Sequence, residues 1–526
     1  MSSCRRRDLP APCPSTNTVA QELARQGPMR PAMVQRWRCA TNTTGRITRL
    51  LAGWESGSGP LAQRLAAAVT DLVDQGDLRD GDTMPSERSL GAALMISRGT
   101  VTEAYNLLRD AQVVESRVGS GTFVTSVGGR GGGGPRGDAR LTSFGSHPVP
   151  RRHDLSSGAP GGLDLVVEHS DRVLRQARLA DLVADDGYEP AGLLELREAL
   201  AGYYADLGVA TSAEEVLVTS GSQQGLAMVA AALVRPGDVV LVEDPSYRGA
   251  LDAFRAQGAR LVPVPVDHSG PDLEVLERLV RQLKPRLFYS LPIAHNPTGS
   301  VITPARAAGL TQILSGSRTI LLEDGSPADL MLDADRPPTP VGHGLPPEQW
   351  VALGSVSKLF WGGLRIGWIR ARSSFLDPLV RAKAVADLGS SPLTQLVAAS
   401  CLSVVDEARA ARRRQLETGY AAAAAILNAD APEWSFTRPG GGSGLWVRVP
   451  GLDASAFGQH ARRHGILVSP GPVFSAVEGC REYLRIPFWR EPDALGDGLT
   501  DLIALWRDHQ RAPTLGTTAG PRHPSP

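Results

Sequence analysis

Lys358 is the residue whose type and setting most clearly indicate chemistry in this chain of 526 residues. Lys284, Lys358 and Lys383 are the three lysines among its 55 basic residues, and the others are arginine. A lysine amine can lose its proton and attack a carbonyl carbon, which a guanidinium cannot do. The apolar run 351–353 leads into the Ser/Gly-rich turn that holds Lys358. We therefore expect Lys358 to be a nucleophile, with an exposed loop lysine as the alternative. Lys284 and Lys383, each two residues from an arginine, are expected to be surface lysines.

A second group of residues is suited to binding an anion such as phosphate. The turn 221–223 lies between an apolar strand and a helix, where backbone N–H groups and the helix dipole favour negative charge. Hydroxyls on either side of residue 356 and an arginine seven residues after Lys358 could reach the same anion. The candidate anion ligands are Gly221, Ser222, Gln223, Ser355, Ser357 and Arg365.

Three further residues follow or end predicted strands and could bind an aromatic ring or a carboxylate. Asn296, in the stretch Asn-Pro-Thr-Gly, could hydrogen-bond a ring hydroxyl. Asp324 ends the stretch Thr-Ile-Leu-Leu-Glu-Asp, where a buried carboxylate would keep a pyridine nitrogen protonated. Arg485 could hold a carboxylate through two parallel hydrogen bonds. Taken singly, these residues also fit simpler roles, such as a helix cap at Asp324 and an exposed strand at Arg485.

Apolar runs and helical periodicity alternate along the second half of the chain. A helix is predicted at 192–207, and another begins at Gln223. Strands are predicted at 216–219, 239–242, 287–291, 319–322 and 351–353. This alternation predicts an α/β domain with a mostly parallel sheet, whose ligands bind at the carboxyl ends of the strands. The candidate residues lie at those ends.

The first periodic segment, residues 46–124, predicts a small helical unit that ends in a β-hairpin. One helix ends near Gly76, a second begins at Pro85-Ser86-Glu87, and Ser97 is the predicted N-cap of a third. Two short helices joined by a tight turn, followed by alternating residues, make a winged helix-turn-helix. The residues expected to face its core are Leu61, Leu65, Ala68, Val69, Leu72, Val73, Leu90, Ala93, Leu94, Val101, Ala104, Tyr105 and Leu108.

This unit resembles the winged helix-turn-helix of GntR-type regulators. It carries Gly-Asp-x-x-Pro-Ser-Glu-Arg at 81–88, Ser-Arg-x-Thr-Val-x-x-Ala-Tyr at 97–105 and Gly-x-Gly-Thr-x-Val at 119–124. The resemblance implies double-stranded DNA as a partner. The residues it implies in DNA contact are Arg88, Ser97, Arg98 and Thr100, with Gly119 at the tip of the wing. Eight arginines against ten acidic residues leave no basic surplus in this unit, so a protein-contact surface is the alternative.

The ordered motifs from about 154 to 508 resemble the fold-type I, pyridoxal-phosphate (PLP)-dependent aminotransferases. They are Gly-Ser-Gln, Asn-Pro-Thr-Gly, the strand-end aspartate, Ser-x-x-Lys and two later arginines. The resemblance implies PLP held as an aldimine on Lys358, with Asp324 at the pyridine nitrogen and Asn296 near O3′. It assigns the phosphate to the anion ligands named above, ring stacking to Tyr247, and the effector's α-carboxylate to Arg485. It also places Tyr188 at the phosphate across a dimer interface.

One departure from the aminotransferase pattern concerns a tyrosine. The family usually has a tyrosine two or three residues after the strand-end aspartate, where this chain has Ser326 and Pro327. We expect cofactor binding to survive this change and full transamination to be weakened. His295, before Asn296, has no assigned role.

The order of the two domains resembles the MocR subfamily of GntR-type transcriptional regulators. It implies a cytoplasmic homodimer whose DNA binding changes when a small amino compound reacts or binds at the PLP–lysine link. The alternatives are an active aminotransferase with an appended DNA-binding domain, and a regulator that has lost PLP.

Composition sets the remaining expectations. Disorder is expected at 1–45, in the Gly-rich linker 125–153 and in the tail 509–526, around domains at 46–124 and 154–508. Five scattered cysteines fit a reducing cytoplasm and predict neither disulfides nor a metal site. No apolar run approaches the ~20 residues of a membrane span, and the basic start lacks the apolar segment of a signal peptide.

Overall fold

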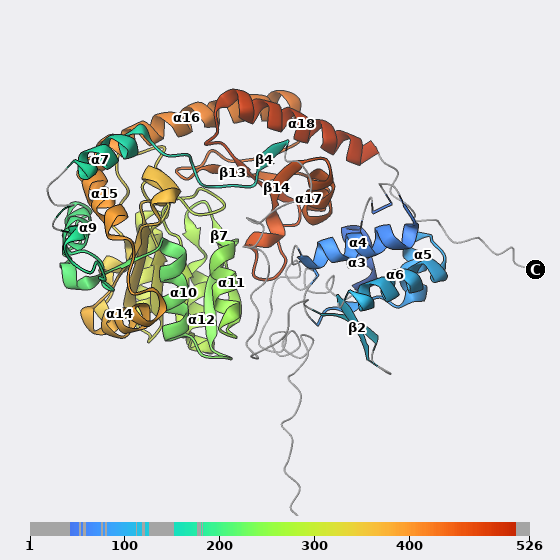
Figure 1. The fold of residues 1–526 in the computed structure, drawn as a ribbon, viewed down its shortest axis with the longest axis horizontal. Helices are drawn as coiled ribbons and strands as arrows, with labels where there is room; N and C mark the ends of the chain where they lie inside the picture. Colours follow the sequence, from blue (N-terminus) through green and yellow to red (C-terminus); the bar gives the residue numbers. More distant parts are fainter. Residues whose placement is uncertain are drawn as a thin grey trace, which may run out of the picture. The chain divides into compact units, whose positions relative to one another are not determined.

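A computed structural model of the chain describes residues 43–51, 54–55, 59–74, 77–78, 81–111, 113–117, 121–125, 152–175, 180 and 182–511. The chain divides into two compact units, residues 1–129 and 130–526 (Figure 1). The segments predicted to be disordered lie almost entirely outside the described residues. At their edges, helices begin at Thr43 and end at Arg511.

The first unit is a winged helix-turn-helix. Its elements are α3 (Thr43–Leu50), α4 (Leu61–Asp74), β1 (Thr83–Met84), α5 (Glu87–Leu94), α6 (Arg98–Asp110), β2 (Val114–Arg117) and β3 (Gly121–Val124). The strands form an antiparallel sheet in the order β1-β3-β2. The predicted N-cap is confirmed, because the Ser97 hydroxyl accepts a hydrogen bond from the Thr100 N–H at 3.1 Å.

The buried face of this unit follows the prediction with two exceptions. All four predicted core residues of α6 are buried, from Val101 to Leu108. Ala93 is exposed, however, and Leu61 is 39% exposed, so these two core predictions are wrong. The short helix α5 ends at Leu94, and Met95 follows it in a left-handed conformation. Gly91, not Ala93, lies against Val101.

The second unit contains an eight-stranded sheet in the order β5-β12-β11-β10-β9-β6-β7-β8. Its strands are β5 (Val216–Thr219), β6 (Val239–Asp244), β7 (Arg260–Asp267), β8 (Gly270–Pro271), β9 (Leu287–Ser290), β10 (Ile320–Asp324), β11 (Trp350–Ser355) and β12 (Gly367–Arg370). Strands β7, β6, β9, β10 and β11 pair in parallel, whereas β12 runs antiparallel to both β11 and β5. The mostly parallel sheet is therefore confirmed.

Helices cover both faces of this sheet (Figure 1). Because side chains alternate along a strand, Leu217 and Val218 enter different hydrophobic cores. One core includes α9 (Leu194–Asp206), α12 (Leu273–Leu283), α13 (Pro304–Ser315) and α15 (Pro392–Leu402). The other includes α10 (Ser222–Leu233), α11 (Arg248–Ala256) and α14 (Ser373–Asp387). Helix α7 (Asp164–Leu174) packs beside α15.

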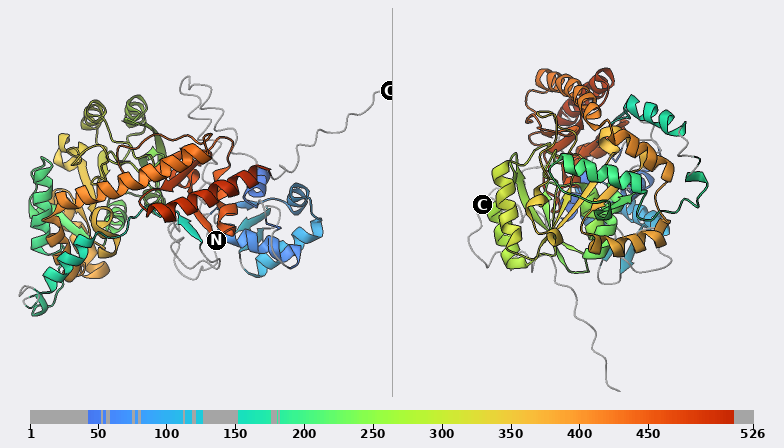
Figure 2. Two further views of the ribbon diagram at one scale, coloured as in Figure 1. Left: turned by 90° about the horizontal axis from the view of Figure 1, so that it is seen from above. Right: turned by 90° about the vertical axis from the view of Figure 1, so that its left-hand side faces the viewer.

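A smaller C-terminal subdomain surrounds a four-stranded sheet in the order β13-β15-β14-β4. Its elements are β4 (His153–Leu155), α16 (Val405–Asp430), β13 (Gly444–Arg448), α17 (Ala454–Arg463), β14 (Ile466–Pro470), β15 (Tyr483–Pro487) and α18 (Pro492–Arg511). Helices α16 and α18 lie side by side (Figure 2). Helix α16 joins two cores, because Ala408 packs with the large sheet and Leu416 and Leu427 pack with the small one. Among the helices that the structure describes, none is long and apolar enough to cross a membrane.

Candidate functional site

Lys358 lies in a short π-helical turn, Ser357–Trp361, directly after β11. Its Nζ donates a hydrogen bond to the Gly158 carbonyl at 3.3 Å. The turn is held from behind by Arg412, which is 1% exposed and donates to the carbonyls of Leu359 and Phe360 at 2.8 and 3.1 Å. A third bond from Arg412 reaches the Gly161 carbonyl at 2.8 Å. The backbone that carries the lysine is therefore fixed while the amine itself is lightly held.

The surroundings of Lys358 favour the neutral amine. Burial lowers the pKa of Lys358 from its ordinary value of 10.5 to about 8, and the positive charge of Arg485 acts in the same direction. Asp324 partly offsets both effects. A neutral amine is the form that attacks a carbonyl, so the site prepares Lys358 as a nucleophile near physiological pH.

This shift predicts the pH dependence of carbonyl capture. We expect the rate at which the ligand-free protein captures PLP to rise about tenfold per pH unit up to about pH 8 and then level off, because the free-amine fraction follows that curve. Stopped-flow absorbance from pH 7 to 10 measures this. Because the folded-state pKa is lowered, the folded chain binds fewer protons between about pH 8 and 10.5, and this amine's contribution to stability rises with pH across that window. A capture rate that keeps rising to pH 10 would contradict the shifted pKa.

The predicted anion ligands gather where β5, β12 and β11 lie side by side. Gly367 pairs with Ser355 on one side and with Thr219 on the other, which brings residues 220–223 near residue 355. Gly221 has a φ of 83°, and a Cβ there would lie 2.7 Å from the Arg365 guanidinium. Arg365 donates to the Ser220 carbonyl at 2.6 Å. A glycine is required at residue 221, and its missing side chain leaves room for an anion beside the arginine.

The other ligands at this turn are partly engaged. The Ser355 hydroxyl donates to the Ile366 carbonyl at 3.1 Å and lies 2.8 Å from the Ser357 hydroxyl. Ser222 begins α10, and the N–H groups of a first helical turn have no acceptor within their helix. The Gln223 side-chain oxygen is buried and finds no hydrogen-bond partner among the described residues. The arrangement suits an anion that accepts several hydrogen bonds at once.

Asp324 ends β10, which lies between β9 and β11 in the sheet. It is 4% exposed, accepts a hydrogen bond from the Tyr289 hydroxyl at 2.7 Å, and accepts two from Ser326 at 3.0 and 2.5 Å. Sequence reasoning missed Tyr289, because nothing separates a tyrosine in the strand Leu-Phe-Tyr-Ser from an ordinary core residue. These bonds orient a carboxylate that could receive a ring N–H.

Two more predicted ring contacts follow neighbouring strands. The Asn296 side-chain oxygen is buried and has no hydrogen-bond partner in the part of the chain that the structure describes. Tyr247 precedes α11, and burial raises its pKa to about 12, so its hydroxyl stays neutral. His295 bonds the Thr298 hydroxyl at 2.8 Å and lies 3.3 Å from a carboxylate oxygen of Glu243. Among the described residues, the Asn296 side-chain oxygen is thus a buried acceptor without a donor, which a bound ligand could supply.

Arg485 lies on β15, near the centre of the small sheet, and is 6% exposed. It donates to the Ser443 hydroxyl at 3.3 Å, and it has no acidic partner among the described residues. A Cβ atom at Gly158 or at Gly444 would clash with its guanidinium, so both positions require glycine. Burial lowers the pKa of Arg485 to about 10, and Arg248 contributes to the shift. A buried guanidinium without a counter-ion is an anion site.

The two other lysines and Tyr188 lie outside this site. The prediction that Lys383 is a surface lysine is wrong, because its side chain is buried in α14. Lys284 is exposed, as predicted. Tyr188 is 62% exposed, so it is available to a partner and does not join the site of its own chain.

The DNA-contact candidates lie at and near the start of α6. Arg88 and Ser97 are exposed, and Arg98 has a side chain that is 74% exposed. The Arg98 guanidinium lies 3.3 Å from the Glu87 carboxylate, so a neighbouring helix steadies it. The Thr100 hydroxyl lies 2.9 Å from that of Ser97. Gly119, the predicted wing-tip contact, lies outside the described residues.

Family comparisons agree with this geometry. Residues 154–493 match the model of the class I and II aminotransferases. The chain belongs to the class I and II aminotransferase family. Residues 61–124 match the gntR family of bacterial regulatory proteins, so this family member carries a GntR winged helix.

Curated relatives include both regulators and an enzyme. The uncharacterised HTH-type transcriptional regulator YisV of Bacillus subtilis is 28% identical, over 82% of this chain and 92% of its own length. The corresponding regulator YjiR of Escherichia coli is also 28% identical, over 81% and 94%. The 2-aminoadipate transaminase of Thermus thermophilus is 31% identical, over 69% of this chain and 91% of the enzyme. The matches to these regulators extend over most of both chains, which is consistent with the MocR subfamily.

A solved structure shows what such a fold binds. The α-aminoadipate aminotransferase LysN of Thermus thermophilus, complexed with N-(5′-phosphopyridoxyl)-L-leucine, has a TM-score of 0.62 and 29% identity. The match covers 68% of this chain and 92% of LysN. PLP is the cofactor of this aminotransferase family. The residues of this chain fit PLP, because three features lie at ends of strands of the large sheet: an Asn296 oxygen without a partner among the described residues, an Asp324 carboxylate held by hydrogen bonds, and the turn at Gly221 beside Arg365.

Proposed function

We propose that the protein is a PLP-dependent transcriptional regulator whose DNA binding responds to a small amino compound. The observation that supports this most directly is the link between Lys358 and Arg485. The Gly158 carbonyl accepts from Lys358 at 3.3 Å and from Ser443 at 2.9 Å, and the Ser443 hydroxyl accepts from Arg485. A nucleophilic amine and a guanidinium without an acidic partner among the described residues are therefore linked by three hydrogen bonds, through the Gly158 carbonyl and the Ser443 hydroxyl. This is the pair of groups that an α-amino acid requires.

The proposed cofactor contacts follow from the geometry of the strand ends. PLP supplies an aldehyde to which amines add and a ring that accepts electrons. Lys358 acts as the amine, Asp324 holds the ring nitrogen, Asn296 bonds the ring hydroxyl and Tyr247 lies against the ring. The phosphate is held by Gly221, Ser222, Gln223, Ser355, Ser357 and Arg365. In a homodimer, the exposed Tyr188 reaches the phosphate of the partner subunit.

The effector acts by joining the two sheets of the large unit. Its carboxylate binds Arg485 on the small sheet, while its amine competes for the place held by Lys358 on the large sheet. A ligand with both groups favours the conformation in which the sheets are close, and it shifts the equilibrium only by its differential affinity for the two conformations. Arg412 binds the turn that carries Lys358 to α16, and α16 contributes side chains to the cores of both sheets, so this helix connects the turn with the small subdomain.

DNA binding is assigned to the start of α6. Ser97 caps the helix, and Arg98 and Thr100 lie in its first turn, where side chains enter the major groove in a winged helix. With Arg88 from α5, they supply phosphate and base contacts. Two copies in a homodimer read two half-sites, and the protein acts in the cytoplasm, where its DNA lies.

The test is a DNA-binding assay with and without PLP. A duplex selected from a random library by the wild-type protein is used in fluorescence anisotropy, with each of the twenty amino acids added in turn. We expect at least one amino acid to change the Kd by about 5- to 150-fold, and to do so when PLP is bound. No enriched duplex, or an equal response without PLP, would overturn the proposal.

An active aminotransferase is the second candidate, favoured by the 31% identity to 2-aminoadipate transaminase. Ser326 weighs against it. It occupies one of the two positions where the family usually has a tyrosine, and its hydroxyl donates a hydrogen bond to Asp324. Sustained formation of keto acid from an amino acid and 2-oxoglutarate, over many turnovers, would establish the enzyme instead.

A further inference from the structure

Lys383 is a buried lysine in a helix that otherwise buries apolar residues. It lies four residues after Leu379 and seven after Leu376 on the inner face of α14, and it is 1% exposed. Packing alone would be served by another leucine at this position. Burying an ammonium is costly unless it is paired and hydrogen-bonded, so its partners indicate what it does.

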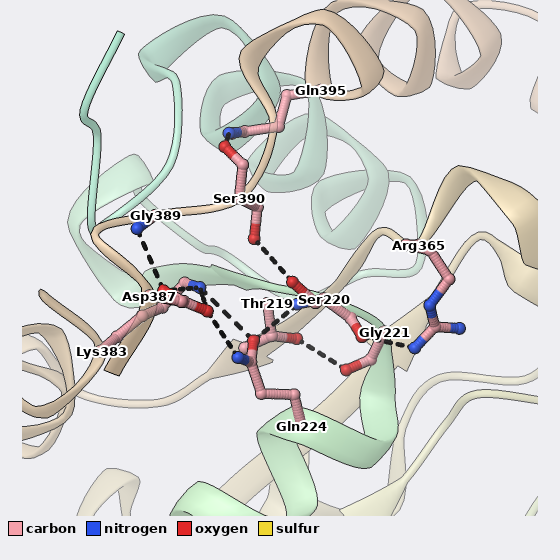
Figure 3. Close-up of polar contacts among 10 residues, drawn as sticks. All are labelled: Thr219, Ser220, Gly221, Gln224, Arg365, Lys383, Asp387, Gly389, Ser390 and Gln395. Carbon is pink, nitrogen blue, oxygen red and sulfur yellow. Dashed lines mark hydrogen bonds and ion pairs between the residues drawn. The ribbon is translucent and has the colours of Figure 1, made fainter. Parts of the chain in front are cut away.

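The partners of Lys383 form one polar cluster (Figure 3). Its Nζ lies 2.8 Å from both carboxylate oxygens of Asp387 and 3.4 Å from the side-chain oxygen of Gln224. Burial would raise the pKa of Asp387, but hydrogen bonds from Lys383, Gln224 and Gly389 outweigh it and lower that pKa. Asp387 is thus held as a carboxylate, and the pair stays ionic.

This ion pair sets the orientation of the Gln224 carboxamide. The Gln224 side-chain nitrogen donates to Asp387 at 2.6 Å, and its oxygen faces the ammonium of Lys383. The same oxygen accepts from the backbone N–H of Ser220 at 2.7 Å. A flipped carboxamide would turn its NH2 group toward two donors, so the charges of Lys383 and Asp387 specify one orientation.

Gln224 in turn holds the backbone of Ser220, which directly precedes the predicted anion-binding turn 221–223. The Ser220 N–H is held by Gln224 and its carbonyl by Arg365, at 2.7 and 2.6 Å (Figure 3). The next residue is Gly221, the N-cap of α10, and the N–H groups at the start of a helix are suited to binding an anion. The path from Lys383 to the turn therefore runs through two side chains.

We propose that Lys383 is a positioning residue for the phosphate-binding turn, acting through Asp387 and Gln224 on the Ser220 peptide. The proposal rests on the PLP site proposed above and concerns the phosphate of that ligand. It assigns Lys383 a role in discriminating PLP from a ligand that has the same ring and aldehyde but no phosphate.

The test compares the affinities of PLP and pyridoxal, which lacks the phosphate. Visible-absorbance titration gives both Kd values for wild type, Lys383→Met and Gln224→Met, and circular dichroism gives the melting temperature of each ligand-free protein. Lys284→Met is the matched control, because it makes the same change at an exposed lysine. We expect Lys383→Met and Gln224→Met, the two network variants, to raise the Kd for PLP about tenfold, while the Kd for pyridoxal changes by less than about twofold. The control should match wild type.

Each other outcome overturns a distinct claim. If the network variants weaken PLP and pyridoxal equally, or weaken neither, the positioning role is wrong and the PLP site stands. If wild type binds no PLP, the proposed cofactor site fails, and this role fails with it. Gln224→Met leaves the Lys383–Asp387 ion pair intact, so it carries the test if Lys383→Met does not fold.

Discussion

Lys358→Ala is expected to abolish the visible absorbance that PLP acquires on binding, together with the response of DNA binding to amino acids. Burial and the charge of Arg485 lower the pKa of the Lys358 amine to about 8, which favours its nucleophilic form, and alanine has no nucleophile to replace it. The turn that holds it depends on Arg412 and backbone carbonyls, which the substitution leaves in place. DNA affinity without an effector should stay within about twofold of wild type, because the winged helix is a separate unit. Absorbance titration and fluorescence anisotropy measure the two effects.

Lys284→Ala is the control for this variant, since it removes an exposed lysine from the same unit. It should keep both the absorbance and the response. A Lys358→Ala protein that responds to amino acids as wild type does would show that the effector acts elsewhere.

Arg485→Met is expected to weaken the response to amino acids about a hundredfold while PLP still binds to Lys358. The guanidinium is buried and donates to Ser443, with no acidic partner among the described residues, so its main use is an external carboxylate. Methionine removes a desolvated charge from the site. The free energy of unfolding of the ligand-free protein should therefore stay the same or rise by about 1 kcal/mol. A loss of function with unchanged or raised stability is the signature of a binding residue.

Two comparisons sharpen this experiment. Ethylamine, an amine without a carboxylate, should act equally on wild type and Arg485→Met, whereas alanine should discriminate between them. Arg485→Lys keeps the charge but not the two parallel donors, and its response to alanine should lie between those of wild type and Arg485→Met. Equal amino-acid responses in wild type and Arg485→Met would place the carboxylate elsewhere.

The sheet and its site edge could be predicted from the sequence because short apolar runs are bounded by turn residues. The strand predicted at 216–219 has the observed bounds, and the runs ending near Asp324 and Ser355 place their last residues at one edge of the sheet. In a parallel sheet, such ends must converge. The convergence of Gly221, Asp324 and Lys358 is therefore a consequence of topology, and their order in the chain reveals it.

Features that depend on partners distant in sequence could not be predicted in this way. Nothing near Arg485 shows that it lacks an acid, and nothing near Tyr289 shows that it donates to Asp324. Lys383 is different, because its spacing from Leu376 and Leu379 is a helical signal of burial that charge alone obscured. Ala93 was misassigned because a helix of eight residues ends before its periodicity is established.

Helix α16 has a consequence for how the large unit unfolds. One continuous helix of 26 residues contributes side chains to the core beneath each sheet. If one core melted, the helix would have to end midway, exposing apolar groups and unpaired carbonyls in its remaining half. The two sheets should therefore lose structure in a single cooperative transition, although each has its own hydrophobic centre. A helix shared in this way makes the subdomains one folding unit.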